Sequence, residues 1–261
     1  MHGLGNDFVV IDAREVPVAI TAARAAAIAD RHTGIGCDQL ILLEPSDVAD
    51  ARMRIFNADG GEVEACGNAT RCIALLMDGP ADIETDGGRL HTEPGDAAAT
   101  VTLEPPVFEW DRIPLALAMD TADMPVGWEM LERPMAANVG NPHVIFFVDD
   151  CDAVDLERLG PLIEHDPLFP DRINVNVATV TAPSAIRLRV WERGVGLTRA
   201  CGTGACATAV AAIQAGKVAS PVTVSLPGGD LIIQWAAGEN IRMTGPATHV
   251  FTGETDWDAF G

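Results

Sequence analysis

The chain has 261 residues, enough for two domains that each bury a hydrophobic core. Its formal net charge of −21, from 17 basic and 38 acidic residues, would repel phosphate backbones, so nucleic acid is excluded as a partner. Since no apolar run approaches the roughly 20 residues of a membrane-spanning helix, no contact with a membrane is expected.

The first half of the chain is expected to alternate strands with two helices. Strands are predicted at residues 8–12, 40–44 and 52–56, where β-branched and large apolar residues dominate. Thr21 is predicted to cap a helix over residues 22–32, and a second helix follows Cys66 and ends at Gly79-Pro80. Glycine-rich turns between apolar residues then predict a hairpin within residues 81–104.

The second half repeats this order of elements. Strands are predicted at residues 144–150, 174–180 and 186–192, with helices around residues 155–166 and from Cys201 to Gly216. A hairpin at residues 222–235 closes the repeat.

Two matching words mark the duplication most clearly. ACGNATRC at residues 65–72 and ACGTGAC at residues 200–206 place Cys66 and Cys201 135 residues apart (201 − 66 = 135). Gly5-Asn6 and Gly140-Asn141 share this offset. The second copy has a strand-like stretch before its Gly-Asn word, whereas the first has only four residues there, so we expect the natural product to carry more residues before Met1.

The predicted fold class is therefore α+β, with two pseudosymmetric domains that arose by internal duplication. Each domain is expected to be a mixed or antiparallel sheet wrapped around a central helix. The domains are predicted at residues 1–115, carrying Cys66, and 116–261, carrying Cys201. Whether the last residues return to the first domain is left open.

The two matching cysteines suit proton transfer. A thiol with a pKa of about 8.5 is only slightly ionised at neutral pH, but a helix N-terminus favours the thiolate. The backbone N–H groups after each cysteine can also bind a carboxylate. Two opposed thiols could invert a carbon next to a carboxylate, one removing a proton and the other delivering one.

The composition argues against cofactor and metal chemistry. Lys217 is the only lysine and there is no tyrosine, and Lys217 lies at an expected helix end, so a pyridoxal phosphate enzyme is excluded and no cofactor is expected. The cysteine spacings C-x5-C and C-x4-C lie outside common zinc patterns, so no metal is expected. Without a C-x-x-C pair or a secretory signal, the predicted location is the cytoplasm.

The two halves of the chain differ at a few corresponding positions, and a substrate is also unsymmetrical away from its reacting carbon. Asn57 corresponds to Glu192, Ala58 to Arg193 and Asn68 to Thr203. A carboxylate and a guanidinium side by side could bind an ammonium group and a carboxylate, respectively.

Longer sequence motifs make the chain resemble one known family. HGLGNDF (2–8), FNADGGEVEACGNATRC (56–72), GNPH (140–143) and ERGVGLTRACGTGAC (192–206) closely resemble the diaminopimelate epimerases. This resemblance implies a cofactor-independent interconversion of LL- and meso-diaminopimelate, on the route to lysine and peptidoglycan, by a homodimer.

The resemblance also assigns residues. It implies that Cys66 and Cys201 exchange the roles of proton donor and acceptor, and that His143 and Glu192 assist them. The substrate contacts that it implies are Asn6, Gln39, Asn57, Gly67, Asn68, Asn141, Asn174, Glu192, Arg193, Gly202 and Thr203.

Three alternatives remain to be compared with this family. A proline racemase or hydroxyproline epimerase has the same fold and thiols, but its first motif normally carries His where this chain has Asn68. A phenazine-biosynthesis-type isomerase lacks the cysteine pair. A non-catalytic redox or metal-binding protein would use the cysteines without needing Asn57, Glu192 or Arg193.

Overall fold

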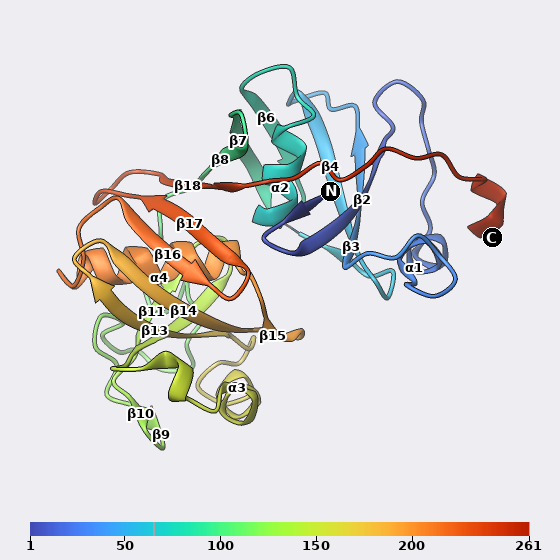
Figure 1. Ribbon diagram of the computed structural model, residues 1–261. Helices are drawn as coiled ribbons and strands as arrows, with labels where there is room; N and C mark the ends of the chain where they lie inside the picture. The colour runs from blue at the N-terminus through green and yellow to red at the C-terminus, as the bar shows by residue number, and fades with distance from the viewer. Residues whose placement is uncertain (65, 261) are drawn as a thin grey trace. The chain divides into compact units, whose positions relative to one another are not determined.

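The computed structural model describes residues 1–64 and 66–260, and the chain divides into two compact units (Figure 1). Unit 1 contains Met1–Val101 and the C-terminal segment from Gly245, and unit 2 contains Thr102–Thr244. The chain leaves unit 1 along β8 (Ala98–Leu103) and returns along β18 (Ile241–Pro246).

A mixed sheet forms the body of unit 1. Its strand order is β1-β2-β3-β4-β6-β7-β8, and the short β5 pairs with β4. The pairs β2/β3 and β4/β6 are parallel, whereas β1/β2, β3/β4 and β6/β7 are antiparallel. The strands are β1 (His2–Gly3), β2 (Asn6–Asp12), β3 (Gln39–Glu44), β4 (Ala51–Asn57), β5 (Glu62–Val63), β6 (Ala81–Thr85) and β7 (Gly88–Pro94).

Unit 2 repeats this pairing scheme. Its order is β11-β12-β13-β14-β16-β17-β18, with β12/β13 and β14/β16 parallel, and β15 pairs with β14 as β5 does with β4. The register repeats too: Phe8 is aligned with Gln39, and His143 with Asn174, 135 residues later in both strands (143 − 8 = 174 − 39 = 135). The strands are β11 (Met135–Asn138), β12 (Pro142–Phe147), β13 (Asn174–Ala182), β14 (Ala185–Glu192), β15 (Gly196–Thr198), β16 (Val222–Leu226) and β17 (Gly229–Gln234). The predicted α+β fold with an internal duplication is confirmed.

One helix in each unit packs on the central strands. In unit 1, α1 (Ala22–Ala29) packs on β3 and β4, and in unit 2, α3 (Leu156–Glu164) packs on β13 and β14. Thr21 caps α1 as predicted, since its side chain accepts the Arg24 N–H at 3.2 Å. The helix ends three residues earlier than expected because Asp30 Oδ1 accepts the N–H groups of His32 and Thr33 and turns the chain.

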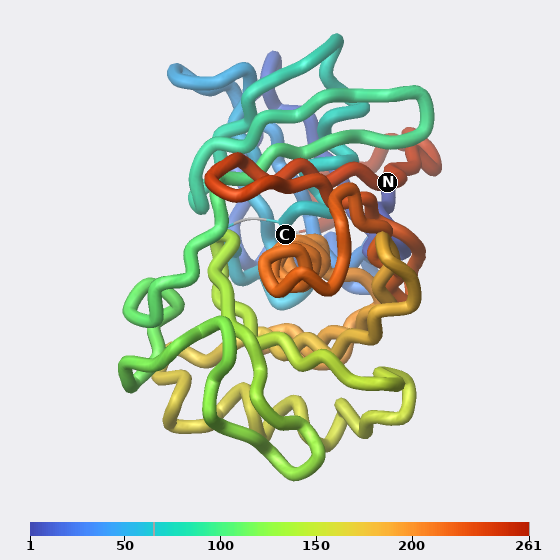
Figure 2. The backbone as a smooth tube through the Cα atoms, turned by 90° about the vertical axis from the view of Figure 1, so that its left-hand side faces the viewer, coloured from blue at the N-terminus to red at the C-terminus, as the bar shows by residue number. Residues whose placement is uncertain are grey.

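The other helix in each unit follows a matching cysteine. In unit 1, α2 (Gly67–Ala74) packs against β1 and β7. In unit 2, α4 (Gly202–Gln214) contacts six strands, and Figure 2 views it nearly along its axis. Its small residues allow this close wrapping. The helix ends at Gln214, two residues before the predicted Gly216. Gly216 follows the C-cap residue Ala215 with a φ of +66°, which favours glycine, and the Lys217 N–H donates to the Ala212 carbonyl at 2.9 Å.

The boundary between the units differs from the sequence-based one at residue 115. Ile113 and Leu115 are buried in the core of unit 2, so the segment after β8 packs there. Ala247 and Trp257 pack against the cores of unit 1, so the C-terminal segment belongs to it. Side-chain packing, rather than the turn residues of the connecting segment, therefore sets the division.

Some short elements were not anticipated. They include β18 and the hairpin of β9 (Gly127–Trp128) and β10 (Leu131–Glu132). Two 3₁₀ helices, η1 (Cys151–Ala153) and η2 (Trp257–Phe260), complete the described chain. None of the helices in residues 1–64 and 66–260 is both long and apolar enough to cross a membrane.

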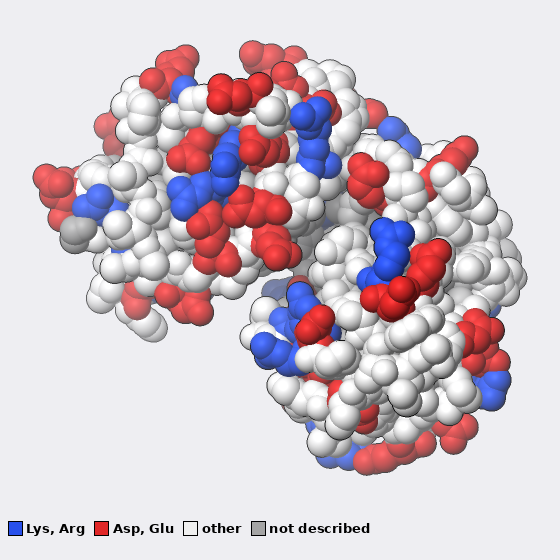
Figure 3. All heavy atoms as spheres, turned by 180° about the vertical axis from the view of Figure 1, so that it is seen from behind, with Lys and Arg blue, Asp and Glu red and all other residues white. Residues whose placement is uncertain are grey.

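The excess of acidic residues leaves most cations paired. On the face in Figure 3, Lys and Arg side chains lie mostly beside Asp or Glu side chains. Arg31, for example, contacts the carboxylates of Asp7 and Asp38, both at 2.7 Å. Exposed pairs of this kind contribute little stability each, about 0–1 kcal/mol.

Gly160 provides a test of the packing of α3. A Cβ atom at this position would lie 2.4 Å from the Trp191 ring, so Gly160→Ala should destabilise the protein by about 1–3 kcal/mol in urea unfolding. The control is Gly79→Ala, because a Cβ atom there meets open space. Equal unfolding midpoints for the two variants would contradict the packing described here.

Candidate active site in two half-sites

Cys66 lies at the N-terminus of α2 in unit 1. It is the N-cap residue, with an extended backbone (φ −146°, ψ 108°), and its carbonyl accepts the Thr70 N–H at 2.9 Å. The half-buried thiol makes no capping bond, and its Sγ lies 3.8 Å from Asn6 Oδ1, to which the S–H donates. The sulfur therefore lies at the positive end of a helix dipole, with an amide carbonyl beside it.

Three other predicted contacts of unit 1 are amide side chains held in pairs. Asn68 Nδ2 donates to Asn6 Oδ1 at 3.2 Å, next to Cys66. Gln39 and Asn57 are aligned across β3 and β4, and Gln39 Nε2 donates to Asn57 Oδ1 at 3.0 Å. Gln39 Oε1 is buried and accepts no hydrogen bond, which leaves an acceptor for a donor group of a ligand.

Cys201 occupies the corresponding position in unit 2, at the N-terminus of α4. It is the N-cap residue, and its Sγ accepts the Gly204 N–H at 3.3 Å and lies 3.6 Å from Thr203 Oγ1. Only 4% of Cys201 is exposed, against a half-buried Cys66. The two thiols therefore share a backbone position and differ in burial.

Glu192, at the end of β14, raises the pKa of the Cys201 thiol. Burial is the largest cause of the increase, and the Glu192 carboxylate adds to it, whereas Thr203 and Gly204 oppose it. Burial also raises the pKa of Glu192 itself, against a 2.5 Å hydrogen bond from Thr198 Oγ1 to Glu192 Oε1. Burial and Glu192 therefore both favour the protonated thiol at Cys201.

His143 is fully buried on β12 and has a partner at each ring nitrogen. Its Nε2 lies 2.8 Å from Asn141 Oδ1, and Asn176 Nδ2 lies 3.1 Å from its Nδ1. Burial lowers the pKa of His143 to about 3, and the positive charge of Arg193 acts in the same direction. The neutral imidazole thus donates from Nε2 and accepts at Nδ1, which orients the amide of Asn141. Assistance to a cysteine, as implied by the resemblance, stays a prediction.

Arg193 is held by its backbone next to Asn174. Its N–H donates to Asn174 Oδ1 at 2.9 Å, and Asn174 Nδ2 donates to the Pro142 carbonyl at 2.9 Å. The guanidinium donates to the Asp171 carbonyl at 3.1 Å. No salt bridge joins Arg193 to a carboxylate within the described parts of the chain, so its charge is available to an anion.

The predicted residues of each unit thus form small clusters of contacting side chains. Unit 1 brings together Asn6, Cys66, Gly67 and Asn68, with Gln39 and Asn57 paired on adjacent strands; unit 2 brings together Asn141 with His143, Asn174 with Arg193, and Glu192, Cys201, Gly202 and Thr203.

The sequence did not single out three residues that support these groups. Arg71, Asn176 and Thr198 contact Asn68, His143 and Glu192, respectively. Arg71 and Asn176 could have been noticed as polar residues within buried stretches. In residues 1–64 and 66–260, no group of three or more His, Cys, Asp or Glu is arranged to hold a metal ion.

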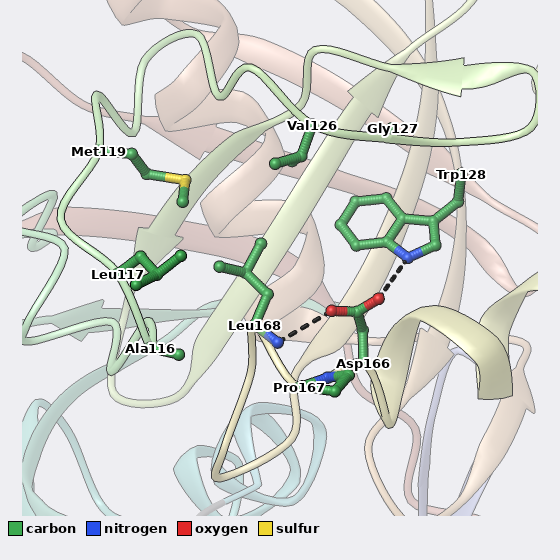
Figure 4. Close-up of a pocket in the computed structure, with 9 residues that line it drawn as sticks. All are labelled: Ala116, Leu117, Met119, Val126, Gly127, Trp128, Asp166, Pro167 and Leu168. Atoms are coloured by element: carbon green, nitrogen blue, oxygen red, sulfur yellow. Dashed lines mark hydrogen bonds between the residues drawn. The ribbon is translucent and has the colours of Figure 1, made fainter.

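A separate apolar pocket lies in unit 2, away from these residues in the sequence (Figure 4). Its lining includes Leu117, Met119 and Trp128. The only carboxylate in it is Asp166, whose two oxygens accept the Trp128 Nε1–H and the Leu168 N–H, both at 2.9 Å. With its carboxylate engaged in this way, the pocket has no group suited to proton transfer.

The effect of Glu192 on Cys201 can be measured by alkylation. In a Cys66→Ala background, Glu192→Gln removes a charge that raises the thiol pKa, so iodoacetamide should modify Cys201 roughly three- to tenfold faster at pH 8. Mass spectrometry of the Cys201 peptide gives the rate. Glu157→Gln, which removes an exposed carboxylate of the same unit, should leave it unchanged. An unchanged rate in Glu192→Gln would contradict this assignment.

Known proteins resemble this chain along its whole length. A family model described as diaminopimelate epimerase matches residues 1–108 and 135–250. A diaminopimelate epimerase from Sphingopyxis alaskensis is 70% identical over 261 residues, covering 100% of this chain and 97% of the relative. One from Rhizorhabdus wittichii is 72% identical over 262 residues, covering 100% of this chain and 96% of the relative.

Solved structures of more distant proteins share the fold. A hydroxyproline epimerase from Agrobacterium vitis matches with a TM-score of 0.63 at 17% identity, covering 94% of this chain and 86% of that one. A phenazine biosynthesis protein of the PhzF family from Bacillus anthracis matches with a TM-score of 0.65 at 16% identity, covering 94% and 92%. These two show the fold alone, whereas the family model and the close relatives show more. The chain belongs to the diaminopimelate epimerase family.

Proposed function

We propose that this protein interconverts LL- and meso-diaminopimelate with Cys66 and Cys201 as its two acid/base groups, without a cofactor. The observation that carries the proposal is the repeated position of the thiols, each the N-cap of a helix in one of two units with the same strand pairing. An epimerase needs one group on each face of the carbon that it inverts. A duplicated unit supplies such a pair.

The proton transfers balance within the thiol pair. A thiolate takes the proton from the α-carbon, and the electron pair of the broken C–H bond moves onto the substrate carboxylate. The opposite thiol then protonates the carbon from the other face and becomes a thiolate. The N–H groups at the starts of α2 and α4, around Gly67 and Gly202, would stabilise the charge on the carboxylate.

The environment of Cys201 supports a role as the proton donor in the first turnover. Burial and Glu192 keep this sulfur protonated, so Cys201 would deliver the proton in the first turnover and Cys66 would act as the base. Each turnover exchanges the two protonation states. The reverse reaction therefore starts from the other state.

Arg193 and Glu192 would distinguish the far end of the substrate. Diaminopimelate carries a second ammonium and a second carboxylate, and Arg193 has no carboxylate partner among the described residues. The matching positions of unit 1 are Asn57 and Ala58, which carry no charge. We infer that unit 2 binds the distal end, with Asn174 holding the Arg193 backbone in place.

The alternatives are less well supported. A proline racemase would have no use for a distal charged site, and the first motif here carries Asn68. A non-catalytic protein would not require the polar residues around either thiol. The family match agrees with the epimerase.

Turnover of LL-diaminopimelate by reduced protein tests the proposal. Chiral chromatography should detect the meso product, and chelators should not change the rate. Cys66→Ala and Cys201→Ala should each lower the rate at least about 100-fold, because each removes an acid/base group. The controls Cys72→Ala and Cys206→Ala change buried cysteines of the same two helices and should stay active. Racemisation of proline without turnover of diaminopimelate would overturn the proposal.

The resemblance further suggests that the protein is a cytoplasmic homodimer. Sedimentation equilibrium should give about twice the chain mass of 27.5 kDa. A single species at the monomer mass would contradict this suggestion.

A further inference from the structure

Unit 1 contains a directed chain of hydrogen bonds that ends in two charged residues. It runs from Arg71 through Asn68 and Asn6 to Asp38. We propose that Arg71 and Asp38 are positioning residues that fix the amide orientations of Asn68 and Asn6 beside Cys66. This proposal rests on the proposed function, since it assigns a task to residues behind that site.

Arg71 fixes the first amide. Its side chain is fully buried in α2, and its Nη2 donates to Asn68 Oδ1 at 2.7 Å. A guanidinium only donates hydrogen bonds, so Asn68 must present its carbonyl to Arg71. Its NH₂ group then points to Asn6, whose Oδ1 it reaches at 3.2 Å.

Asp38 fixes the other end. Its ionised carboxylate only accepts hydrogen bonds, so Asn6 must present its NH₂ group to it, and Asn6 Nδ2 donates to Asp38 Oδ2 at 3.0 Å. Asp38 is itself anchored, because Arg31 donates to its Oδ1 at 2.7 Å and the Asp7 N–H to its Oδ2 at 3.1 Å.

The two ends therefore allow one orientation of both amides. Flipping the Asn68 amide would turn its NH₂ group toward the Arg71 guanidinium, which can only donate, and its carbonyl toward the Asn6 carbonyl. Flipping the Asn6 amide would turn its carbonyl toward the Asp38 carboxylate, which can only accept, and its NH₂ group toward that of Asn68. In the allowed orientation the Asn6 carbonyl faces Cys66 Sγ at 3.8 Å and accepts its S–H. Arg71 and Asp38 thus hold the Asn6 carbonyl beside the Cys66 thiol, although none of their own bonds in this hydrogen-bond chain is made to the sulfur.

Unit 2 has no such chain. With the offset of 135, Arg71 corresponds to Cys206 and Asp38 to Ile173 (206 − 71 = 173 − 38 = 135). Asn141, which corresponds to Asn6, is instead oriented by His143 Nε2 at 2.8 Å. Changes at Arg71 or Asp38 should therefore alter Cys66 and leave Cys201 unchanged.

Asp38→Asn is the sharpest test, and Asp7→Asn is its matched control. Both carboxylates bind Arg31, so both variants remove one negative charge from the same cluster, but only Asp38 accepts the bond from Asn6. Both side chains are partly exposed (45% and 38%), so both variants should fold.

Two measurements separate positioning from a general loss of structure. The first is the iodoacetamide alkylation rate of Cys66 in a Cys201→Ala background, and of Cys201 in a Cys66→Ala background. Asp38→Asn should speed alkylation of Cys66 roughly three- to tenfold beyond Asp7→Asn, because the thiol loses its acceptor, and should not affect Cys201. The second is diaminopimelate turnover with both thiols present, where Asp38→Asn should lower kcat about tenfold and Asp7→Asn less than twofold.

Arg71→Lys provides a second variant. It keeps the charge and loses the planar fork, and it should change Cys66 alone, as Asp38→Asn does. If it unfolds, the Asp38→Asn comparison decides alone. Equal Cys66 alkylation rates in Asp38→Asn and Asp7→Asn, or equal changes at both thiols, would overturn the proposal. A wild-type protein that leaves diaminopimelate unchanged would defeat the proposed function instead, while the alkylation rates still test the positioning.

Discussion

The structure depends on placing a thiol at the first turn of a packed helix. A buried thiolate is costly, because removal from water penalises the charged form. The unpaired N–H groups of a helix N-terminus offset part of that cost and can also hold the carboxylate of a substrate. This requirement explains why α2 and α4 begin immediately after their cysteines and lie against the sheets of their units. It also explains the small residues of α4, since large side chains would keep the strands from approaching.

The duplication gives the two units the same backbone arrangement, and the side chains that differ between the units give the two thiols different surroundings. The strand pairing and register repeat between the units, so the backbone presents Cys66 and Cys201 in the same way. The surroundings of the sulfurs do not repeat. Cys66 is half-buried beside an amide carbonyl, whereas Cys201 is nearly fully buried beside a carboxylate that raises its pKa. We infer that two such surroundings suit an enzyme whose thiols alternate between two protonation states.

The sequence predicted the duplicated strands and helices better than the packing between distant segments. The offset of 135 depends on local motifs and on alternating apolar residues, which are visible in one chain. The strands lie, and both cysteine helices begin, where these patterns indicate, but α2 ends at Ala74, before the predicted stop at Gly79-Pro80. The end of the first segment of unit 1 at Val101, and the strand β18, depend on long-range packing of the connecting and C-terminal segments, which local patterns do not report.

The same limit applies to the site. The amides of Asn6 and Asn141 could be predicted from their repeated words, but their partners could not. Asp38 bonds Asn6, and His143 bonds Asn141, only after the chain folds, and the neutral state of His143 depends on its complete burial. Residues that act by positioning another residue do not form a motif that can be recognised in the sequence.

We propose that two different groups serve the two faces of the α-carbon. This proposal is tested most directly by the distribution of deuterium at low conversion of LL-diaminopimelate in deuterated water. Two thiols predict deuterium at one α-carbon of the meso product and almost none in the recovered LL substrate, because the group that takes the proton is not the one that delivers it. Equal labelling of product and recovered substrate from the earliest times would show a single exchanging base and would contradict the account.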